Sequence, residues 1–146
     1  MRASSLVCLL ALVGCAAAKH QGAFGVEGKL MCGTKPAEDV RIRLCVEHAE
    51  KGHVPILLAE GKTGADGAYS LKANVSQEHQ IEARLILLTD CADGILPGAR
   101  LFTFDIPQQY VERGVTETKK ICPMGVINLE LKHEKEQREL ENPYTP

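Results

Sequence analysis

The sequence lacks an excess of charge of either sign, because 17 basic and 19 acidic side chains give a net charge of −2. This balance argues against a nucleic-acid-binding surface, which needs many unpaired cations. Internal repeats and low-complexity tracts are absent, so nothing indicates a second domain. After the N-terminus no apolar run is long enough to span a bilayer. What is present, 45% hydrophobic and 25% charged residues in a chain of 146, is the composition of one globular domain.

Motifs for metal binding and catalysis are also missing. No two cysteines have C-x-x-C spacing, which argues against a structural zinc site, and no G-x-S-x-G sequence provides a nucleophile. The histidines fall in predicted loops or termini without a partner that would orient an imidazole. His48 and His53 flank one loop and could bind a metal or sense pH, but solvent-exposed loop side chains are the simpler interpretation. We therefore expect no metal, no cofactor and no enzymatic activity. The five histidines are His20, His48, His53, His79 and His133.

The first 18 residues have the pattern of a secretory signal peptide. Arg2 provides the positive start, residues 6–13 the short apolar core, and residues 16–18 the small side chains of a cleavage site. Cleavage after Ala18 would leave a chain that starts at Lys19 and is secreted to the extracellular space. An alternative is a bacterial lipoprotein box, in which Cys15 would be lipidated and anchor the protein to a membrane.

The predicted signal peptide contains two of the six cysteines, so four remain in the mature chain. An even number in an oxidising compartment predicts two disulfide bonds. These four residues are Cys32, Cys45, Cys91 and Cys122.

Period-two alternation dominates the mature chain and predicts an all-β fold. Asp66-Gly67 is a hairpin-turn sequence that separates two of the predicted strands. Seven strands without intervening helices predict a seven-stranded, antiparallel, two-sheet β-sandwich over residues 19–131. The residues 132–146 would form a charged C-terminal tail, a solvated extension that could be helical. The strands are expected at residues 24–30, 40–47, 56–59, from Tyr69 onward, 81–89, 100–107 and 125–131.

Several motifs in this order resemble the nematode transthyretin-like proteins. They are Gly28 to Cys32, Lys35-Pro36-Ala37, the stretch 40–44, Asp66 to Leu71, the strand 81–88 that closes at Cys91, the sequence 106–111, and Gly125 to Leu129. The resemblance spans residues 24–131 and implies a secreted sandwich of the transthyretin (prealbumin) type. It also implies an extracellular carrier or recognition module for lipids, small apolar molecules or cell surfaces, because the family has no common catalytic motif.

A relative of transthyretin hydrolyses 5-hydroxyisourate with clustered histidines and a C-terminal Tyr-Arg-Gly-Ser. This chain ends in Asn142-Pro143-Tyr144-Thr145-Pro146 instead, so we do not expect that activity.

Two functional classes follow from this resemblance. In the first, the protein carries or recognises a small apolar ligand, a lipid or a cell-surface protein through an apolar patch. Ile86 and Leu88 point to the side of their strand that faces away from the predicted core, so they are the candidates for such a patch or for a homo-oligomer interface. Alternatively, they lie beneath the loop of residues 93–98. In the second, it regulates or inhibits another extracellular protein through loops such as residues 48–55.

Strand directions in a sandwich of this topology predict two disulfide bonds, Cys32 to Cys91 and Cys45 to Cys122. Cys32 and Cys91 each lie at the end of a predicted strand, at the same end of the sandwich, and each continues the series of inward-pointing side chains of its strand. Cys45 and Cys122 would meet at the opposite end of the sandwich. Asn74-Val75-Ser76 fits the N-glycosylation rule and predicts a glycan at Asn74.

Overall fold

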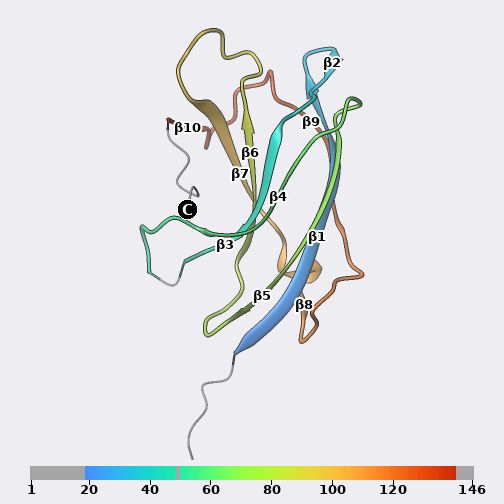
Figure 1. The fold of residues 1–146 in the computed structure, drawn as a ribbon, viewed down its shortest axis with the longest axis vertical. Coiled ribbons are helices and arrows are strands. Elements are labelled where there is room, and N and C mark those ends of the chain that lie inside the picture. Colours follow the sequence, from blue (N-terminus) through green and yellow to red (C-terminus); the bar gives the residue numbers. More distant parts are fainter. Residues whose placement is uncertain (1–18, 49, 141–146) are drawn as a thin grey trace, which may run out of the picture.

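A computed structural model describes residues 19–48 and 50–140 and shows two packed β-sheets (Figure 1). The predicted signal peptide and Cys15 lie outside the described residues. One sheet contains β1 (His20–Cys32), β2 (Lys35–Pro36), β5 (Ala68–Gln77), β8 (Glu112–Arg113) and β9 (Cys122–Asn128). The other contains β3 (Arg41–Val46), β4 (Ile56–Lys62), β6 (Ala83–Thr89), β7 (Ala99–Asp105) and β10 (Gln137–Glu139); a 3-10 turn, η1 (Gln108–Tyr110), follows β7.

The all-β sandwich is confirmed, and its long strands correspond to those predicted from alternation. The second sheet has the order β10-β7-β6-β3-β4 and is antiparallel throughout. In the first sheet β1 is central, with β5 antiparallel on one side and β9 parallel to it on the other. β6 pairs antiparallel with β3, as the disulfide argument required.

The main core lies between the sheets and contains the predicted inward phases. Phe24 and Val26 of β1 face Leu44 of β3, Leu85 of β6 and Phe102 of β7, and all five are buried. Alternation explains this arrangement, because side chains two residues apart on a strand point to the same face.

The outer face of the second sheet carries a second, smaller apolar cluster, formed by Cys45, Ile86 and Leu88. The expectation that Ile86 and Leu88 form an exposed patch is wrong, because only 3% and 5% of these residues is exposed. Neighbouring strands cover them: Leu57 of β4 and Leu101 of β7 pack against the cluster.

A buried arginine adds to this cover. Arg43 of β3 is fully buried, and its guanidinium donates to Glu60 of β4 at 2.7 Å and to Glu139 of β10 at 3.0 Å. Because β6 and β7 stand between β3 and β10 in the sheet, the pair with Glu139 crosses the outer face above them.

One of the two predicted disulfide bonds is present. Cys32 and Cys91 are joined, with a Cα–Cα distance of 5.9 Å, and the bond connects the end of β1 to the end of β6. The Cys45–Cys122 bond is wrong. Cys45 belongs to the outer cluster, whereas Cys122 points from β9 into the core between the sheets, so the second sheet separates the two sulfur atoms.

The C-terminal region packs on the molecule, so its interpretation as a solvated extension is wrong as far as Leu140. We call residues 132–140 the C-terminal strap. Its residues Gln137–Glu139 form β10 on the edge of β7. Ion pairs from Arg100 to Glu136 and from Arg138 to Asp93 hold it there, in addition to Arg43–Glu139.

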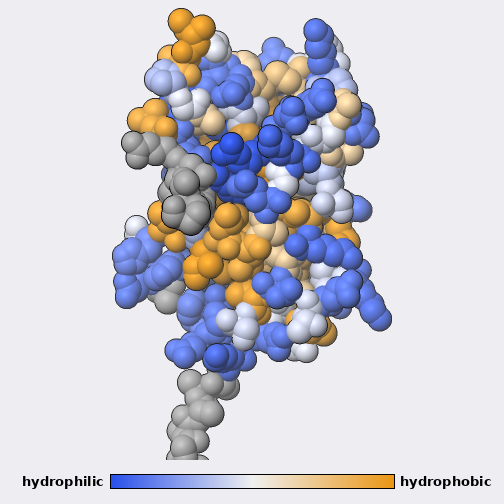
Figure 2. Space-filling view, viewed as in Figure 1, coloured by the Kyte–Doolittle hydropathy of each residue, from blue (hydrophilic) through white to orange (hydrophobic). Residues whose placement is uncertain are grey.

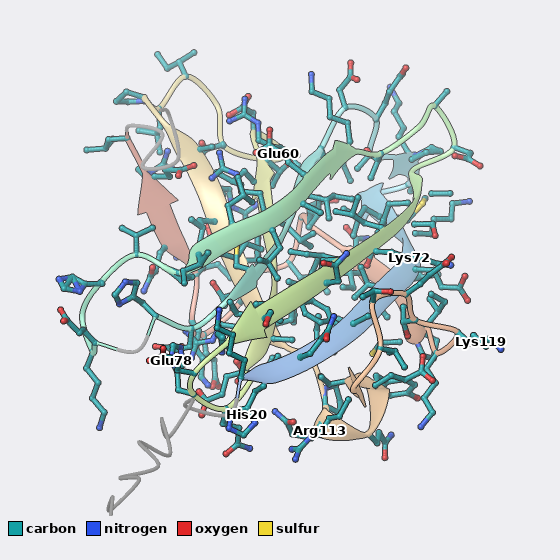
Figure 3. All side chains as sticks on the ribbon, turned by 60° about the horizontal axis from the view of Figure 1, so that its bottom comes forward. His20, Glu60, Lys72, Glu78, Arg113 and Lys119 are labelled. Atoms are coloured by element: carbon teal, nitrogen blue, oxygen red, sulfur yellow. A yellow bond between two sulfur atoms is a disulfide. The ribbon has the colours of Figure 1, made fainter. Side chains whose placement is uncertain are left out.

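Among the described residues, no helix is long and apolar enough to span a membrane. Asn74 lies inside β5, not beyond a strand, and its side chain faces solvent. The glycan at Asn74 stays a prediction. His20 and Arg113 lie close together at the end of the sandwich opposite β2 (Figure 3).

Candidate functional site

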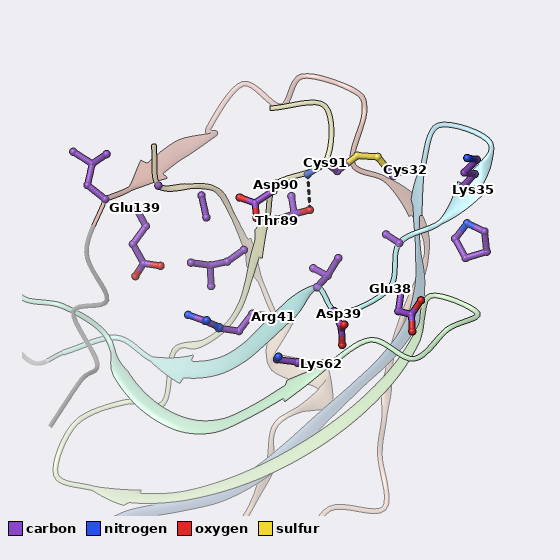
Figure 4. A pocket seen from close by; sticks show the side chains of 17 residues that line it. Cys32, Lys35, Glu38, Asp39, Arg41, Lys62, Thr89, Asp90, Cys91 and Glu139 are labelled. Carbon is purple, nitrogen blue, oxygen red and sulfur yellow. Dashed lines mark hydrogen bonds between the residues drawn. A yellow bond between two sulfur atoms is a disulfide. The ribbon is translucent and has the colours of Figure 1, made fainter. Parts of the chain in front are cut away.

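A groove of about 620 Å³ lies at the end of the sandwich that carries β2 and the disulfide bond. We call this end the disulfide pole. Three segments form the walls of the groove: the connection from β2 into β3, the end of β6 with the following Cys91, and the strap at Glu139 and Leu140 (Figure 4). Leu88 and Ala99 add apolar surface between these walls.

The wall between β2 and β3 is fixed by one buried hydroxyl. Thr63 Oγ1 donates to the carbonyl of Ala37 at 2.6 Å and accepts from the amide of Val40 at 3.0 Å. The intervening Asp39 adopts a φ of 58°, and its amide donates to the Thr63 carbonyl. A buried threonine therefore holds a short, otherwise irregular connection in one conformation.

The disulfide wall is fixed by Arg100 as well as by the covalent bond. Arg100 Nη1 donates to the carbonyls of Cys91 at 2.7 Å and Leu129 at 2.6 Å. Its Nε and Nη2 donate to Glu136 of the strap at 2.6 and 2.9 Å. These bonds from Arg100 hold the pKa of the Glu136 carboxyl below its ordinary value. One arginine thus connects the strap to the segment that ends β6.

The strap wall depends on a close backbone approach at Gly98. Gly98 has a φ of +83°, and a Cβ atom there would overlap the carbonyl oxygen of Glu139. Behind it, Arg138 donates to the Asp93 carboxylate and to the Pro97 carbonyl. Hydrogen bonds from Arg138 hold the pKa of the Asp93 carboxyl below its ordinary value. Glycine is therefore required where the strap meets β7.

Two basic side chains of the groove lie next to each other without a carboxylate among the described residues that pairs with either of them. Arg41 of β3 and Lys62 of β4 stand directly opposite each other in the strand register. Neither forms an ion pair with any described residue. Like charges in directly opposed positions are destabilising. Asp90 and Glu139 lie on the other side of the groove (Figure 4).

Comparison with known proteins identifies the fold family. Residues 27–107 match the model of the Transthyretin-like family. The chain belongs to this family. Three relatives from Caenorhabditis elegans are similar to this transthyretin-like chain over most of its length. Transthyretin-like protein 46 is 38% identical over 136 residues, which is 92% of this chain and 74% of that protein. Transthyretin-like protein 33 is 34% identical, covering 90% of each chain, and transthyretin-like protein 5 is 35% identical, covering 88% and 91%.

Among solved structures, a 9R-lipoxygenase from Cyanothece matches 74% of this chain and 16% of the lipoxygenase chain. Its TM-score of 0.39 and sequence identity of 15% carry no argument about function.

The residues that sequence analysis of this transthyretin-like protein singled out for other reasons lie only partly in the groove. Cys32, Cys91 and Leu88 line it, whereas Ile86 and Asn74 do not. His48 and His53 do meet, with ring centroids 4.9 Å apart, but no group of three metal-ligating side chains occurs among residues 19–48 and 50–140.

The groove residues that sequence analysis missed are mainly Arg41, Lys62 and the strap. Arg41 and Lys62 are recognised as a pair of opposed like charges only when the β3–β4 register is known. The strap residues 137–139, Gln-Arg-Glu, carry no strand pattern at all.

Proposed function

We propose that this transthyretin-like protein is a secreted, extracellular binding protein that holds a small ligand with an apolar body in the groove at the disulfide pole. The observation that carries the proposal is the groove itself, which combines apolar side chains, among them Leu88, Ala99 and Leu140, with seven charged side chains. Concave sites of this size are typical of ligand binding. The apolar patch expected at Ile86 and Leu88 is replaced by this site.

Secretion is supported by the Cys32–Cys91 bond together with the signal sequence. Disulfide bonds persist in oxidising compartments and are rare in the cytosol. The mature chain is expected to start at Lys19.

Recognition of another surface is a second candidate function, and one observation favours it. Ile95 and Leu96 protrude from the connection between β6 and β7, with exposed fractions of 102% and 60%. Apolar surface is visible at this end of the molecule in Figure 2. Adjacent exposed apolar side chains on a connection held by a disulfide bond suit docking on a cell-surface protein or lipid.

The first test is native mass spectrometry of protein recovered from the medium of cells that express the full chain. We expect the mass of residues 19–146 plus a bound ligand, with any glycan at Asn74 and any oligomer visible in the same spectrum. N-terminal sequencing of the same material checks the start at Lys19; a lipidated Cys15 would contradict secretion as a soluble chain.

Occluding variants test whether the ligand occupies the groove. Ala99→Trp fills it from β7, and Pro36→Trp fills it from the opposite wall. Ala68→Trp, on the exposed outer face of β5, is the matched control. We expect loss of ligand mass and of binding of the neutral dye Nile red in the first two variants only. Wild-type protein that carries no ligand and binds no Nile red would overturn the proposal.

A further inference from the structure

Arginines near the groove follow a pattern that Arg41 breaks. On the second sheet and its strap, Arg43, Arg84, Arg100 and Arg138 each contact at least one carboxylate. Arg41 lies on the same sheet, partly buried, yet none of its guanidinium donors is bonded within the described residues. A guanidinium has five donors, and no nitrogen of Arg41 is among the buried polar atoms that lack a hydrogen-bond partner, so these donors are accessible to a ligand in the groove.

The carboxylates that could pair with Arg41 are held across the groove. Asp90 follows Leu88, the register partner of Arg41, by two residues, and is therefore its diagonal neighbour. Diagonal neighbours on adjacent strands are about 7–8 Å apart, a separation that long side chains can span, yet no ion pair joins Arg41 to Asp90 in the structure. Figure 4 shows Asp90 and Glu139 on one side of the groove and Arg41 and Lys62 on the other.

The other acids do not remove this separation. Glu139 already accepts hydrogen bonds from Arg43, so its charge is partly neutralised. Asp39 lies on the same side of the groove as Lys62. Arg41 and Asp90 are left as opposed charges without an ion pair among the described residues, although Asp90 also interacts electrostatically with Arg138 of the strap. The apolar side chain of Leu88 lies between them.

The geometry points to a zwitterionic ligand, whose anionic group binds Arg41 while its ammonium group binds Asp90 and its apolar body lies over Leu88 and Ala99. This inference rests on the proposed function of the same groove. A planar guanidinium suits a carboxylate in a two-point hydrogen bond, and the carboxylate of Asp90 suits an ammonium. A second negative charge on the ligand would meet Asp39 or Asp90, which disfavours polyanions.

The test uses four probes with the same six-carbon body: 6-aminohexanoate, hexanoate, hexylamine and hexanol. Each is titrated into the secreted full chain, and binding is followed by amide chemical shifts of the groove residues. We expect 6-aminohexanoate to bind about tenfold more tightly than either singly charged probe, because only it forms both charge-assisted contacts.

Single variants assign each charge. Arg41→Gln should reduce the affinity for 6-aminohexanoate to that for hexylamine, and Asp90→Asn should reduce it to that for hexanoate. Neither side chain forms a hydrogen bond or an ion pair among the described residues, so neither change removes such a contact; Asp90→Asn weakens only the electrostatic interaction with Arg138. Arg113→Gln, at the opposite end of the sandwich and exposed, is the matched control and should change nothing (Figure 3).

The outcomes separate the inference from the function on which it rests. If hexanol or hexanoate binds as tightly as 6-aminohexanoate, or if Arg41→Gln leaves its affinity unchanged, the zwitterion inference is wrong while a groove ligand remains supported. If none of the four probes and no Nile red binds, the proposed function itself is wrong.

Discussion

Single residues decide where the groove is and how wide it is. Thr63 fixes one wall with two hydrogen bonds from a buried hydroxyl, and Arg100 fixes another by bonding two carbonyls and Glu136. Gly98 lets the strap approach β7 closely enough to form the third wall. None of these roles could be assigned from sequence, because each depends on partners that lie elsewhere in the chain, up to 41 residues away.

The contribution of the Gly98 contact can be measured with a matched pair of glycines. Both Gly98 and Gly94 have positive φ, so alanine at either position should cost about 1 kcal/mol of backbone strain. Only at Gly98 does a new Cβ meet the strap; at Gly94 it meets nothing within 4 Å. Displacing the strap should add about 1–3 kcal/mol for Gly98→Ala, measured as the free energy of unfolding in urea. Equal losses in the two variants would show that the strap yields freely.

At the scale of strands, alternation predicted the long elements and failed for the short strands β2, β8 and β10. β3 and β6 were placed correctly because their inward apolar phases bury against the other sheet. Sequence analysis recognised the outward-pointing side chains of β6, Ile86 and Leu88, as apolar but did not predict that they are buried. They are covered by residues of other segments, namely Leu57, Leu101 and the Arg43–Glu139 ion pair. β10 was missed because ion pairs with distant strands, not apolar burial, hold it in place.

The strap should therefore loosen when its carboxylates lose their charge. The pKa values of Asp93 and Glu136 are lowered in the folded protein by hydrogen bonds from Arg138 and Arg100. Their stabilising contribution is thus fully present above their ordinary values of 3.8 and 4.5 and is lost as the pH falls below them. We expect hydrogen exchange of the β10 amides to accelerate below about pH 4 before the β3 and β6 amides respond.

Glu139→Gln should loosen the strap at neutral pH, because the buried Arg43 keeps only Glu60 of the two carboxylates. Removal of one partner from a buried ion pair costs about 3–5 kcal/mol, and the remaining partner should reduce this to about 2–4 kcal/mol. Glu134→Gln, on an exposed strap residue without an ion pair among the described residues, is the control. Exchange rates at β10 that are the same in both variants would contradict the role of the pair.

At the scale of the whole molecule, one disulfide bond, at the disulfide pole, links the two sheets within the described residues. The fold class and family could be predicted because seven alternating strands and their motifs are spread along the chain. The groove could not, because its lining comes from six separate segments of the chain. Correct phase identified the Cys32–Cys91 bond. The Cys45–Cys122 bond was inferred from the pole at which the two residues were expected to meet, and it is wrong because Cys122, the first residue of β9, points into the core.

The bond should therefore act on stability and on the groove together. A double Cys32→Ala and Cys91→Ala variant opens a loop with a sequence separation of 59 residues, which should lower the free energy of unfolding by about 2–4 kcal/mol. Because both cysteines line the groove, affinity for Nile red should also fall at a temperature where the variant is fully folded. Affinity that survives a measured loss of stability would show that Thr89 and Arg100, which bond the amide and the carbonyl of residue 91, hold this wall without the covalent link.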